Sequence, residues 1–445
     1  MSDIISEIKV AKSAALKLAT MSTSVKDAAL DAMAEALDKN RQRILDANAT
    51  DMAIAENLKV SGKLTDALVK RLKVNDEKIS GMIDGIRDVK RLKDPVGETM
   101  SALELDSGLM LYQIRCPIGM LGVIFESRPD VVPQILALCL KSGNGVAFKG
   151  GSEASNSNRA LFEILSEAAS RAGIPTEAFV LMETREDISQ ILGLHQYIDL
   201  LIPRGSNEFV QYIQNNTKIP VLGHAAGICH IYVDDAADIG LALRATLDSK
   251  IQYPAVCNAV ETLLINERIA EAFLPRMAQL FADNGVEMRA DERSKRILAD
   301  TYDGVGSIVD AMDSDWDTEY NDLTISIKIV KDVEEAIGFI NTHGSHHTDA
   351  IMSEDKTHQM SFVKSVDSAD VFINASTRFA DGYRYGKGAE VGISTNKIHS
   401  RGPVGMEGLM IYKYVLVGNG HVVKDYVGKD AKSYTHKQKD EDFRL

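Results

Sequence analysis

The residue with the clearest chemical potential is Cys257, in the run Tyr253-Pro254-Ala255-Val256-Cys257-Asn258. It follows a proline and lies between a helical segment and an apolar run typical of a strand, so we expect a loop. A loop thiol near amide donors or helix ends can ionise and act as a nucleophile. The alternative is an inert loop thiol. The other cysteines are expected to be structural, two in apolar segments and one at a turn: Cys139, Cys229 and Cys116.

Two turns between a strand and a helix could hold an anion. Phe148-Lys149-Gly150-Gly151-Ser152 follows an apolar run and precedes a helical pattern, and Pro203-Arg204-Gly205-Ser206 has the same placement. A cationic side chain at the end of a strand, followed by glycines that open a helix, is typical of such sites. An ordinary turn without a ligand remains the alternative for both.

The common nucleotide and metal signatures are absent. Phe148 stands where a GxGxxG motif beginning at Gly143 would have its third glycine, and no GxxxxGK[ST] run occurs. The histidines within residues 343–347 have no acids or cysteines at a recognised ligand spacing, so we expect a polar loop and no metal. The glycine-dense runs 385–395 and 401–405 predict either backbone amides that approach a ligand or tight turns at a domain junction.

The elements that must position these residues follow from the hydrophobic pattern. The first hundred residues are predicted to be helical, with one apolar face within residues 30–37. The β-rich runs 108–115 and 120–127 are joined by residues 116–119, whose Pro-x-Gly predicts the turn of a hairpin. Short apolar runs then alternate with helical patterns, which indicates an α/β fold with mainly parallel sheets and helices on both faces.

The composition sets outer limits. The chain has 445 residues, 45% hydrophobic and 26% charged, as in a globular protein of roughly two or three domains. A net charge of −14 argues against extended contact with nucleic acid or an anionic membrane. The cysteines form no CxxC pair, the N-terminus lacks an apolar signal core, and no long apolar window occurs. We therefore expect a cytoplasmic protein.

Several longer runs together resemble the family of gamma-glutamyl phosphate reductases, within the aldehyde dehydrogenase superfamily. The most specific runs are residues 116–131, 148–151, 222–234, 253–264, 340–351 and 373–395. The resemblance implies a Rossmann-type cofactor domain, an α/β catalytic domain and a small β oligomerisation element. It also implies NADPH-dependent reduction of L-glutamyl 5-phosphate to L-glutamate 5-semialdehyde and phosphate, in proline biosynthesis. The residues alone do not fix NADPH over NADH.

On this resemblance the domains are expected to have discontinuous boundaries. Residues 1–107 and 126–232 would form the cofactor domain, and residues 233–408 the catalytic domain. Residues 108–125 and 409–445 would form an oligomerisation hairpin and a C-terminal strand with its tail, in a homo-oligomer. Glutamate 5-kinase is a candidate partner because an acyl phosphate is labile, although no run in the sequence indicates such a contact.

The resemblance assigns roles to individual positions. Cys257 matches the nucleophile, and the neighbouring Asn258 is a candidate donor to the oxyanion. Lys149 matches a lysine that contacts the adenosine ribose and its 2′-phosphate. Gly205 and Ser206 match a pair facing the pyrophosphate, and Glu319 matches a glutamate that holds the nicotinamide ribose.

The substrate would bring a phosphate, an α-carboxylate and an α-ammonium group. Arg128 and Arg378 are candidates for its anions, because a guanidinium binds such groups through two hydrogen bonds. Glu126 is a candidate for the ammonium, and Ser127 stands near the superfamily's oxyanion asparagine. Surface salt bridges are the alternative for the charged residues.

One departure from the superfamily pattern bears on the reaction. The general-base glutamate of oxidising members falls near Gly223 or His224, where this chain has no carboxylate. That glutamate activates water to hydrolyse the thioester, whereas a reductase must keep water away. The departure favours acyl-phosphate reduction and leaves open which group activates Cys257.

Three other functions stay open on the sequence. A hydrolytic NAD(P)-dependent aldehyde dehydrogenase would oxidise the semialdehyde without phosphate. A cysteine acyltransferase would not bind a nicotinamide. A non-catalytic scaffold is disfavoured because Cys257, Lys149 and Glu319 are all present.

Overall fold

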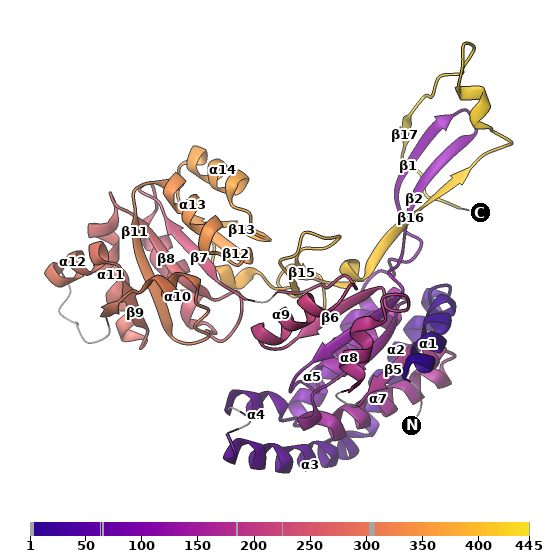
Figure 1. The fold of residues 1–445 in the computed structure, drawn as a ribbon, viewed down its shortest axis with the longest axis horizontal. Helices are drawn as coiled ribbons and strands as arrows, with labels where there is room; N and C mark the ends of the chain where they lie inside the picture. Colours follow the sequence, from indigo (N-terminus) through magenta and orange to yellow (C-terminus); the bar gives the residue numbers. More distant parts are fainter. Residues whose placement is uncertain are drawn as a thin grey trace.

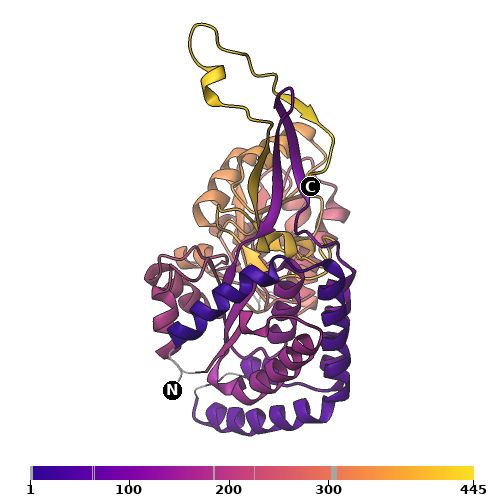
Figure 2. The same ribbon diagram turned by 90° about the vertical axis from the view of Figure 1, so that its right-hand side faces the viewer.

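The computed structural model describes residues 4–62, 64, 66–183, 186–224, 226–301 and 308–444. They form two α/β bodies and an extended β arm (Figure 1). The arm projects from the first body, as the rotated view also shows (Figure 2). Among the described helices, none combines the length and the apolar character needed to cross a bilayer.

The first body contains a four-stranded parallel sheet in the order β5-β4-β3-β6. Strands β3 and β4 are buried along their whole length, as expected where helices cover both faces. The strands are β3 (Met120–Phe125), β4 (Gly145–Lys149), β5 (Phe179–Met182) and β6 (Leu200–Arg204). The helices after β3 are α6 (Val131–Ser142), α7 (Ser155–Arg171), α8 (Glu186–Gly193) and α9 (Asn207–Asn216), with the short η1 (Ser152–Ala154) and η2 (Thr176–Ala178).

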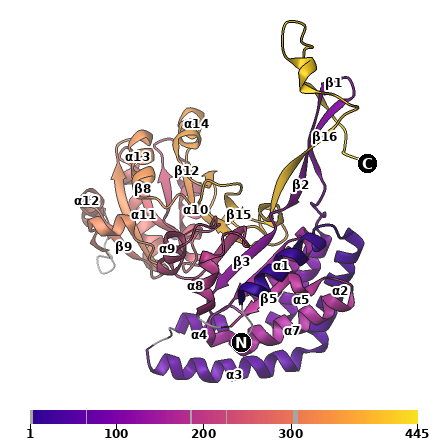
Figure 3. The ribbon, with the colours of Figure 1, turned by 45° about the vertical axis from the view of Figure 1, so that its right-hand side comes forward.

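The predicted N-terminal helices pack on this body. They are α1 (Ile4–Leu18), α2 (Thr23–Lys39), α3 (Arg41–Val60), α4 (Asp66–Leu72) and α5 (Asp76–Arg91). The apolar face expected within residues 30–37 is buried on α2, so this part of the prediction is confirmed. Helices α3 and α4 lie at the end of the body that is farthest from the arm (Figure 3).

The second body contains a seven-stranded parallel sheet in the order β10-β9-β11-β8-β7-β12-β13. The strands are β7 (Cys229–Val233), β8 (Val260–Asn266), β9 (Glu287–Ala290), β10 (Ile308–Asp310), β11 (Thr324–Val330), β12 (Thr348–Met352) and β13 (Asp370–Ile373). The helices are α10 (Ile239–Ile251), α11 (Ala270–Asp283), α12 (Glu292–Thr301), α13 (Val333–His343) and α14 (Lys356–Ser365), with the short η4 (Asp313–Asp317) and η5 (Thr377–Phe379). Both large sheets are parallel, as the sequence predicts.

The last segment joins the bodies to the arm. It contains the antiparallel pair β14 (Gly392–Ser394) and β15 (Gly402–Val404), followed by η6 (Met406–Leu409). The arm is an antiparallel sheet in the order β16-β2-β1-β17. Its elements are β1 (Thr99–Asp106), β2 (Leu109–Pro117), β16 (Met410–Val417), η7 (Val423–Tyr426) and β17 (Lys437–Lys439).

The hairpin predicted from runs 108–115 and 120–127 does not form. Strand β2 pairs with β1 and β16 in the arm, whereas β3 pairs in parallel with β4 and β6 in the first body. Cys116 therefore lies in a strand, opposite Ile411, and not in a turn. The burial explains the difference: β3 is a continuous apolar run buried on both faces, and such a run suits a parallel sheet better than a hairpin with one solvated face.

Candidate active site

Cys257 lies, half-buried, in the loop between α10 and β8. The loop is anchored to the segment that includes η5, because Asn258 Nδ2 donates to the Ala380 carbonyl at 2.8 Å. In addition, Thr377 Oγ1 donates to the Asn258 carbonyl at 2.7 Å. These two contacts fix the backbone on the C-terminal side of the thiol. One amide hydrogen of Asn258, the predicted oxyanion donor, is thus committed to the protein.

Small and aromatic side chains surround the thiol on the side of β7 and β12. The Cys229 thiol donates to the Cys257 carbonyl at 3.2 Å. A Cβ atom on Gly227 would lie 2.3 Å from that carbonyl oxygen, so only glycine fits there. One nitrogen of His224, one nitrogen of His347 and the Cys257 sulfur lie within 4.8 Å of one another. The two imidazoles pack edge to face, with ring centroids 5.1 Å apart.

Two guanidinium groups, those of Arg378 and Arg204, interact electrostatically with the same thiol. Burial lowers the pKa of Arg378, whereas the Cys257 thiolate would raise it. Its Nε donates to Gln252 Oε1 at 2.9 Å. Burial, and then the neighbouring Arg128, lower the pKa of Arg204, which also interacts with Cys257. Guanidinium groups that are buried and close to other positive charges bind an anion favourably, because the anion offsets their mutual repulsion.

Arg128 supplies a third guanidinium close to Arg204. Within the described part of the chain, its guanidinium has neither a hydrogen bond nor an ion pair. Ser127, next to it, has a φ of 46° and donates from its N and Oγ to Glu153 Oε1 at 2.8 and 2.7 Å. The structure therefore holds the backbone before Arg128 in a bend and commits the Ser127 hydroxyl to Glu153.

Lys149 lies at the carboxyl end of β4, almost fully buried, and its Nζ donates to the Gly150 carbonyl at 2.5 Å. Beside it is a hollow between β4, β5 and the start of α7. A Cβ atom on Gly150 would lie 2.1 Å from Asn158 Nδ2. The buried Asn158 Oδ1 has no hydrogen-bond partner within the described residues. The hollow is narrow, and the buried cation of Lys149 lies next to it in the chain.

Gly205 and Ser206 directly precede α9, with Ser206 as its N-cap, and N–H groups at the start of a helix can hold an anion. The Ser206 N–H donates to Glu126 Oε2 at 3.1 Å, and a Cβ atom on Gly205 would lie 2.6 Å from the same oxygen. Burial raises the pKa of Glu126, and the Ser206 N–H opposes this. The contacts of Glu126 thus place it with the proposed pyrophosphate residues. Its proposed contact with the substrate ammonium remains a prediction.

Glu319 connects the two bodies. Asn207 Nδ2, on the first turn of α9, donates to Glu319 Oε2 at 2.9 Å. Glu319 also interacts electrostatically with His224, which lies beside Cys257. The structure therefore brings Gly205, Ser206, Glu319 and Cys257 into one continuous region.

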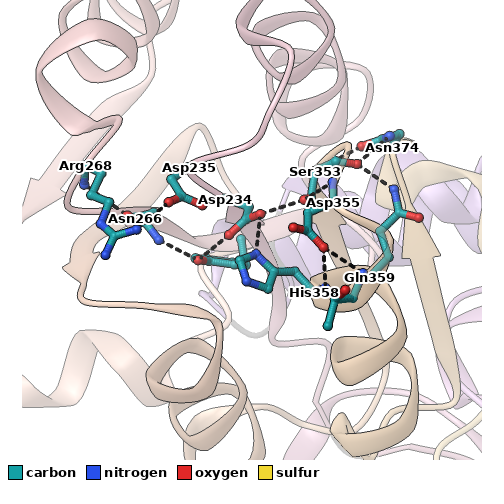
Figure 4. A network of polar contacts seen from close by, with 11 residues as sticks. Asp234, Asp235, Asn266, Arg268, Ser353, Asp355, His358, Gln359 and Asn374 are labelled. Carbon is teal, nitrogen blue, oxygen red and sulfur yellow. Dashed lines mark hydrogen bonds and ion pairs between the residues drawn. The ribbon is translucent and has the colours of Figure 1, made fainter.

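A separate polar network lies at the carboxyl ends of β7, β8, β12 and β13 (Figure 4). The buried Asp234 carboxylate accepts from Tyr232 Oη at 2.9 Å and from Ser353 Oγ at 2.6 Å. His358 Nδ1 lies 2.9 Å from Asp234 Oδ2, the oxygen that also accepts from Ser353, and this contact raises the pKa of His358. Asp234, Asp235 and His358 have ligand-type atoms within 4.8 Å of one another. Because both oxygens of Asp234 already accept hydrogen bonds from the protein, we interpret the group as structural.

Sequence reasoning missed two residues of the site. Arg204 was noticed only as part of an anion-binding turn, and its approach to Cys257 depends on the packing of the two bodies. The HGSHH run was expected to be a polar loop, but His347 is fully buried. The signal that could have identified it is its position directly before the apolar run of β12. His346, before it, has a φ of 59°, which lets the chain turn inwards.

Comparisons with known proteins show the family and the fold. The sequence profile of the Aldehyde dehydrogenase family matches residues 1–297. A gamma-glutamyl phosphate reductase of Methanosarcina mazei is 62% identical over 442 residues, which cover 99% of this chain and 98% of that one. The crystal structure of a gamma-glutamyl phosphate reductase from Thermotoga maritima has a TM-score of 0.90 at 39% identity, covering 95% of this chain and 100% of that chain. An engineered glycolyl-CoA reductase with bound NADP⁺ shares the fold, with a TM-score of 0.63 at 15% identity over 92% of this chain and 95% of that one.

Proposed function

The chain belongs to the gamma-glutamyl phosphate reductases of the aldehyde dehydrogenase family, and we propose that it reduces L-glutamyl 5-phosphate to L-glutamate 5-semialdehyde with NADPH, through a thioester on Cys257. The product would serve proline biosynthesis. The observation that carries the proposal is a half-buried loop thiol that interacts electrostatically with two desolvated guanidiniums, those of Arg204 and Arg378. A thiol nucleophile beside cations suits a carbonyl substrate that carries an anionic leaving group.

The cofactor is proposed to lie along the first body and end at Cys257. Members of the family use NAD(P), and NADPH is the proposal for this chain. Lys149 would contact the adenosine ribose and its 2′-phosphate. Gly205 and Ser206 would hold the pyrophosphate at the start of α9, and Glu319 would hold the nicotinamide ribose.

The substrate is proposed to be bound mainly through its charges. Arg128, whose guanidinium has no hydrogen bond in the described residues, and Arg378 would bind the phosphate and the α-carboxylate. Glu126 would meet the α-ammonium. Since each guanidinium is close to other cations or is desolvated, binding an anion there relieves an unfavourable arrangement.

The reaction then divides into two covalent steps. The Cys257 sulfur attacks the γ-carbonyl carbon, and the backbone amides of its loop, with the remaining amide hydrogen of Asn258, stabilise the oxyanion. Phosphate leaves and a thioester remains. When bound, NADPH supplies the hydride that converts this thioester to a thiohemiacetal. Cys257 is then released as the thiohemiacetal collapses to the aldehyde.

The proposal also covers assembly and location. The exposed apolar side chains of β16, among them Ile411, Tyr412, Tyr414 and Leu416, make the arm a candidate surface for homo-oligomer formation. The four cysteines are free, which suits a cytoplasmic location. A contact with glutamate 5-kinase remains a candidate on chemical grounds alone.

The reverse reaction tests this function against simple aldehyde oxidation. The purified protein is incubated with L-glutamate 5-semialdehyde and NADP⁺ or NAD⁺, with and without phosphate or arsenate. We expect reduction of NADP⁺ that requires phosphate or arsenate. Rapid reduction without either anion would show that the thioester is hydrolysed by water and would contradict the proposal.

A further inference from the structure

The contacts around Cys257 leave a chemical question open, because its thiol must lose a proton before it can attack. Cys257 shares its immediate surroundings with His224 and His347, one nitrogen of each ring and the sulfur being within 4.8 Å of one another. An imidazole is the side chain best suited to exchange a proton near neutral pH. The role of each histidine therefore depends on which of its ring nitrogens carries a proton.

The hydrogen bond of His224 defines its tautomer. Its Nδ1 lies 2.9 Å from the Ile393 carbonyl oxygen. A carbonyl oxygen can only accept a hydrogen bond, so Nδ1 must carry a proton. In the neutral ring Nε2 then has a free lone pair. Burial lowers the pKa of His224, which keeps the ring neutral and that lone pair available.

The charges that face His224 act in both directions. The Ile393 carbonyl, Glu319 and Glu390 favour the protonated ring, whereas Arg204 and burial oppose it, and burial is the largest effect. Glu319 is held by Asn207 Nδ2, and Glu390 accepts from the Gly382 N–H at 2.8 Å. These neighbouring carboxylates can stabilise a transient imidazolium. His224 can therefore accept a proton and release it again.

His347 is held more rigidly. Its Nδ1 lies 2.8 Å from Thr348 Oγ1 and 3.8 Å from the Cys229 sulfur. Its Nε2 is buried and has no partner among the described residues. An unpaired buried ring nitrogen is unusual in a folded protein and is found where a function requires it. Because the ring is fully buried, it cannot itself deliver a proton to a substrate group.

We propose that His224 is the acid–base residue that takes the proton of the Cys257 thiol, and that His347 is a positioning residue that holds the His224 ring against the sulfur. The positioning role is inferred from the edge-to-face contact of the two rings, whose planes make an angle of 78°. His224 is the more exposed ring of the two, so it can also reach a group of the substrate. His224 thus supplies the group that activates Cys257, which the sequence left open.

The proton balance follows directly, and this part rests on the proposed function. The Cys257 sulfur forms a bond to the γ-carbonyl carbon, and the bond from that carbon to the phosphate oxygen breaks. The thiol proton moves to His224 Nε2 and from there to the leaving oxygen, which departs as hydrogen phosphate. No additional oxidant or reductant is needed. A general acid–base residue of this kind typically contributes on the order of 10²–10⁴ in rate.

The test measures the thiol itself and needs neither substrate nor cofactor. The rate of iodoacetamide alkylation at Cys257 is followed by mass spectrometry of the peptide that contains it, across pH 5.5 to 9. The variants are His224→Asn and His347→Asn. Asparagine can retain the hydrogen bond made on the δ side of the ring but has no ε nitrogen. His346→Asn is the control, because His346 bonds to the Asp367 carbonyl and a left-handed backbone tolerates asparagine.

We expect His224→Asn to slow alkylation at pH 7 roughly tenfold or more and to move the pH profile to higher pH. His347→Asn should have a smaller effect in the same direction, and His346→Asn none. Imidazole added to His224→Ala should restore part of the rate, which a purely structural role would not allow. An unchanged alkylation profile in a folded His224→Asn would overturn the proposal. If alkylation changes as expected but the protein does not reduce glutamyl phosphate, the proposed function is wrong. The roles of His224 and His347 towards the Cys257 thiol are then still supported.

Discussion

At the carboxyl ends of β7, β8, β12 and β13 the polar side chains bond to one another. At the amino ends of these strands, several buried polar atoms have no hydrogen-bond partner among the residues that the structure describes. At the carboxyl ends, Asp234 accepts from Tyr232 and Ser353 and lies against His358. At the amino ends, the atoms without a partner in the described part of the chain include Asn258 Oδ1, Glu261 Oε1 and His347 Nε2.

This difference separates stability from function within one sheet. Unpaired buried polar atoms are unfavourable, so a fold tolerates them where a ligand or a reaction uses them. The Asp234 network at the carboxyl ends connects four strands by hydrogen bonds and leaves few polar groups free to bind a ligand. The amino ends of the strands, where polar atoms lack partners, lie beside the nucleophile Cys257, two desolvated guanidiniums and two imidazoles. Substitutions at the two ends should therefore have different effects.

The largest expected effect on stability comes from Asp234→Ala. It would leave the Tyr232 and Ser353 hydroxyls and His358 without their acceptor, and breaking such a buried network typically costs about 3–5 kcal/mol. The free energy of unfolding by urea measures it. Asp235→Asn is the control, because Asp235 pairs with the largely exposed Arg268. A loss below about 1 kcal/mol would show that the network is not the main anchor of this end.

Arg378→Lys should act on binding and leave the fold in place. Lysine keeps the charge but loses the planar group that donates to Gln252 and is proposed to bind the substrate anion. We expect the KM for glutamyl phosphate to rise about tenfold, equivalent to about 1.4 kcal/mol. Steady-state kinetics measures this, with Arg268→Lys at the other end of the sheet as the control. Equal KM values for Arg378→Lys and the wild type would remove Arg378 from the substrate site.

The smallest expected effect is the pH dependence of the stability that His358 contributes at the carboxyl ends of the strands. The Asp234 contact raises the pKa of His358 above its ordinary value of 6.5. The contact between His358 and Asp234 therefore stabilises the fold fully below about pH 6.5, which is the pKa of histidine in the unfolded chain. This stabilisation is lost as the pH rises through the raised pKa of His358 in the folded protein. The difference in unfolding free energy between the wild type and His358→Gln should be larger at about pH 6 than at pH 9. A difference that does not change with pH would contradict a charged His358.

The sequence predicted some of this arrangement and missed the rest for identifiable reasons. Buried apolar runs indicated parallel sheets, and Cys139 in an apolar helix was correctly separated from Cys257 in a loop. The run of β3 was misassigned to a hairpin because a local turn signal was preferred to its continuous apolar character. The pairing of His224 with His347 joins residues far apart in the chain, and no local pattern contains such a contact.

The central claim, a glutamyl thioester on Cys257, can be tested by trapping it. Glutamyl phosphate is generated in place without any nicotinamide, the reaction is quenched in acid, and the peptide containing Cys257 is analysed by mass spectrometry. We predict that this peptide carries a glutamyl group that hydroxylamine removes, and that Cys257→Ala carries none. A wild-type protein that turns over glutamyl phosphate with NADPH but never carries the group on Cys257 would contradict the account.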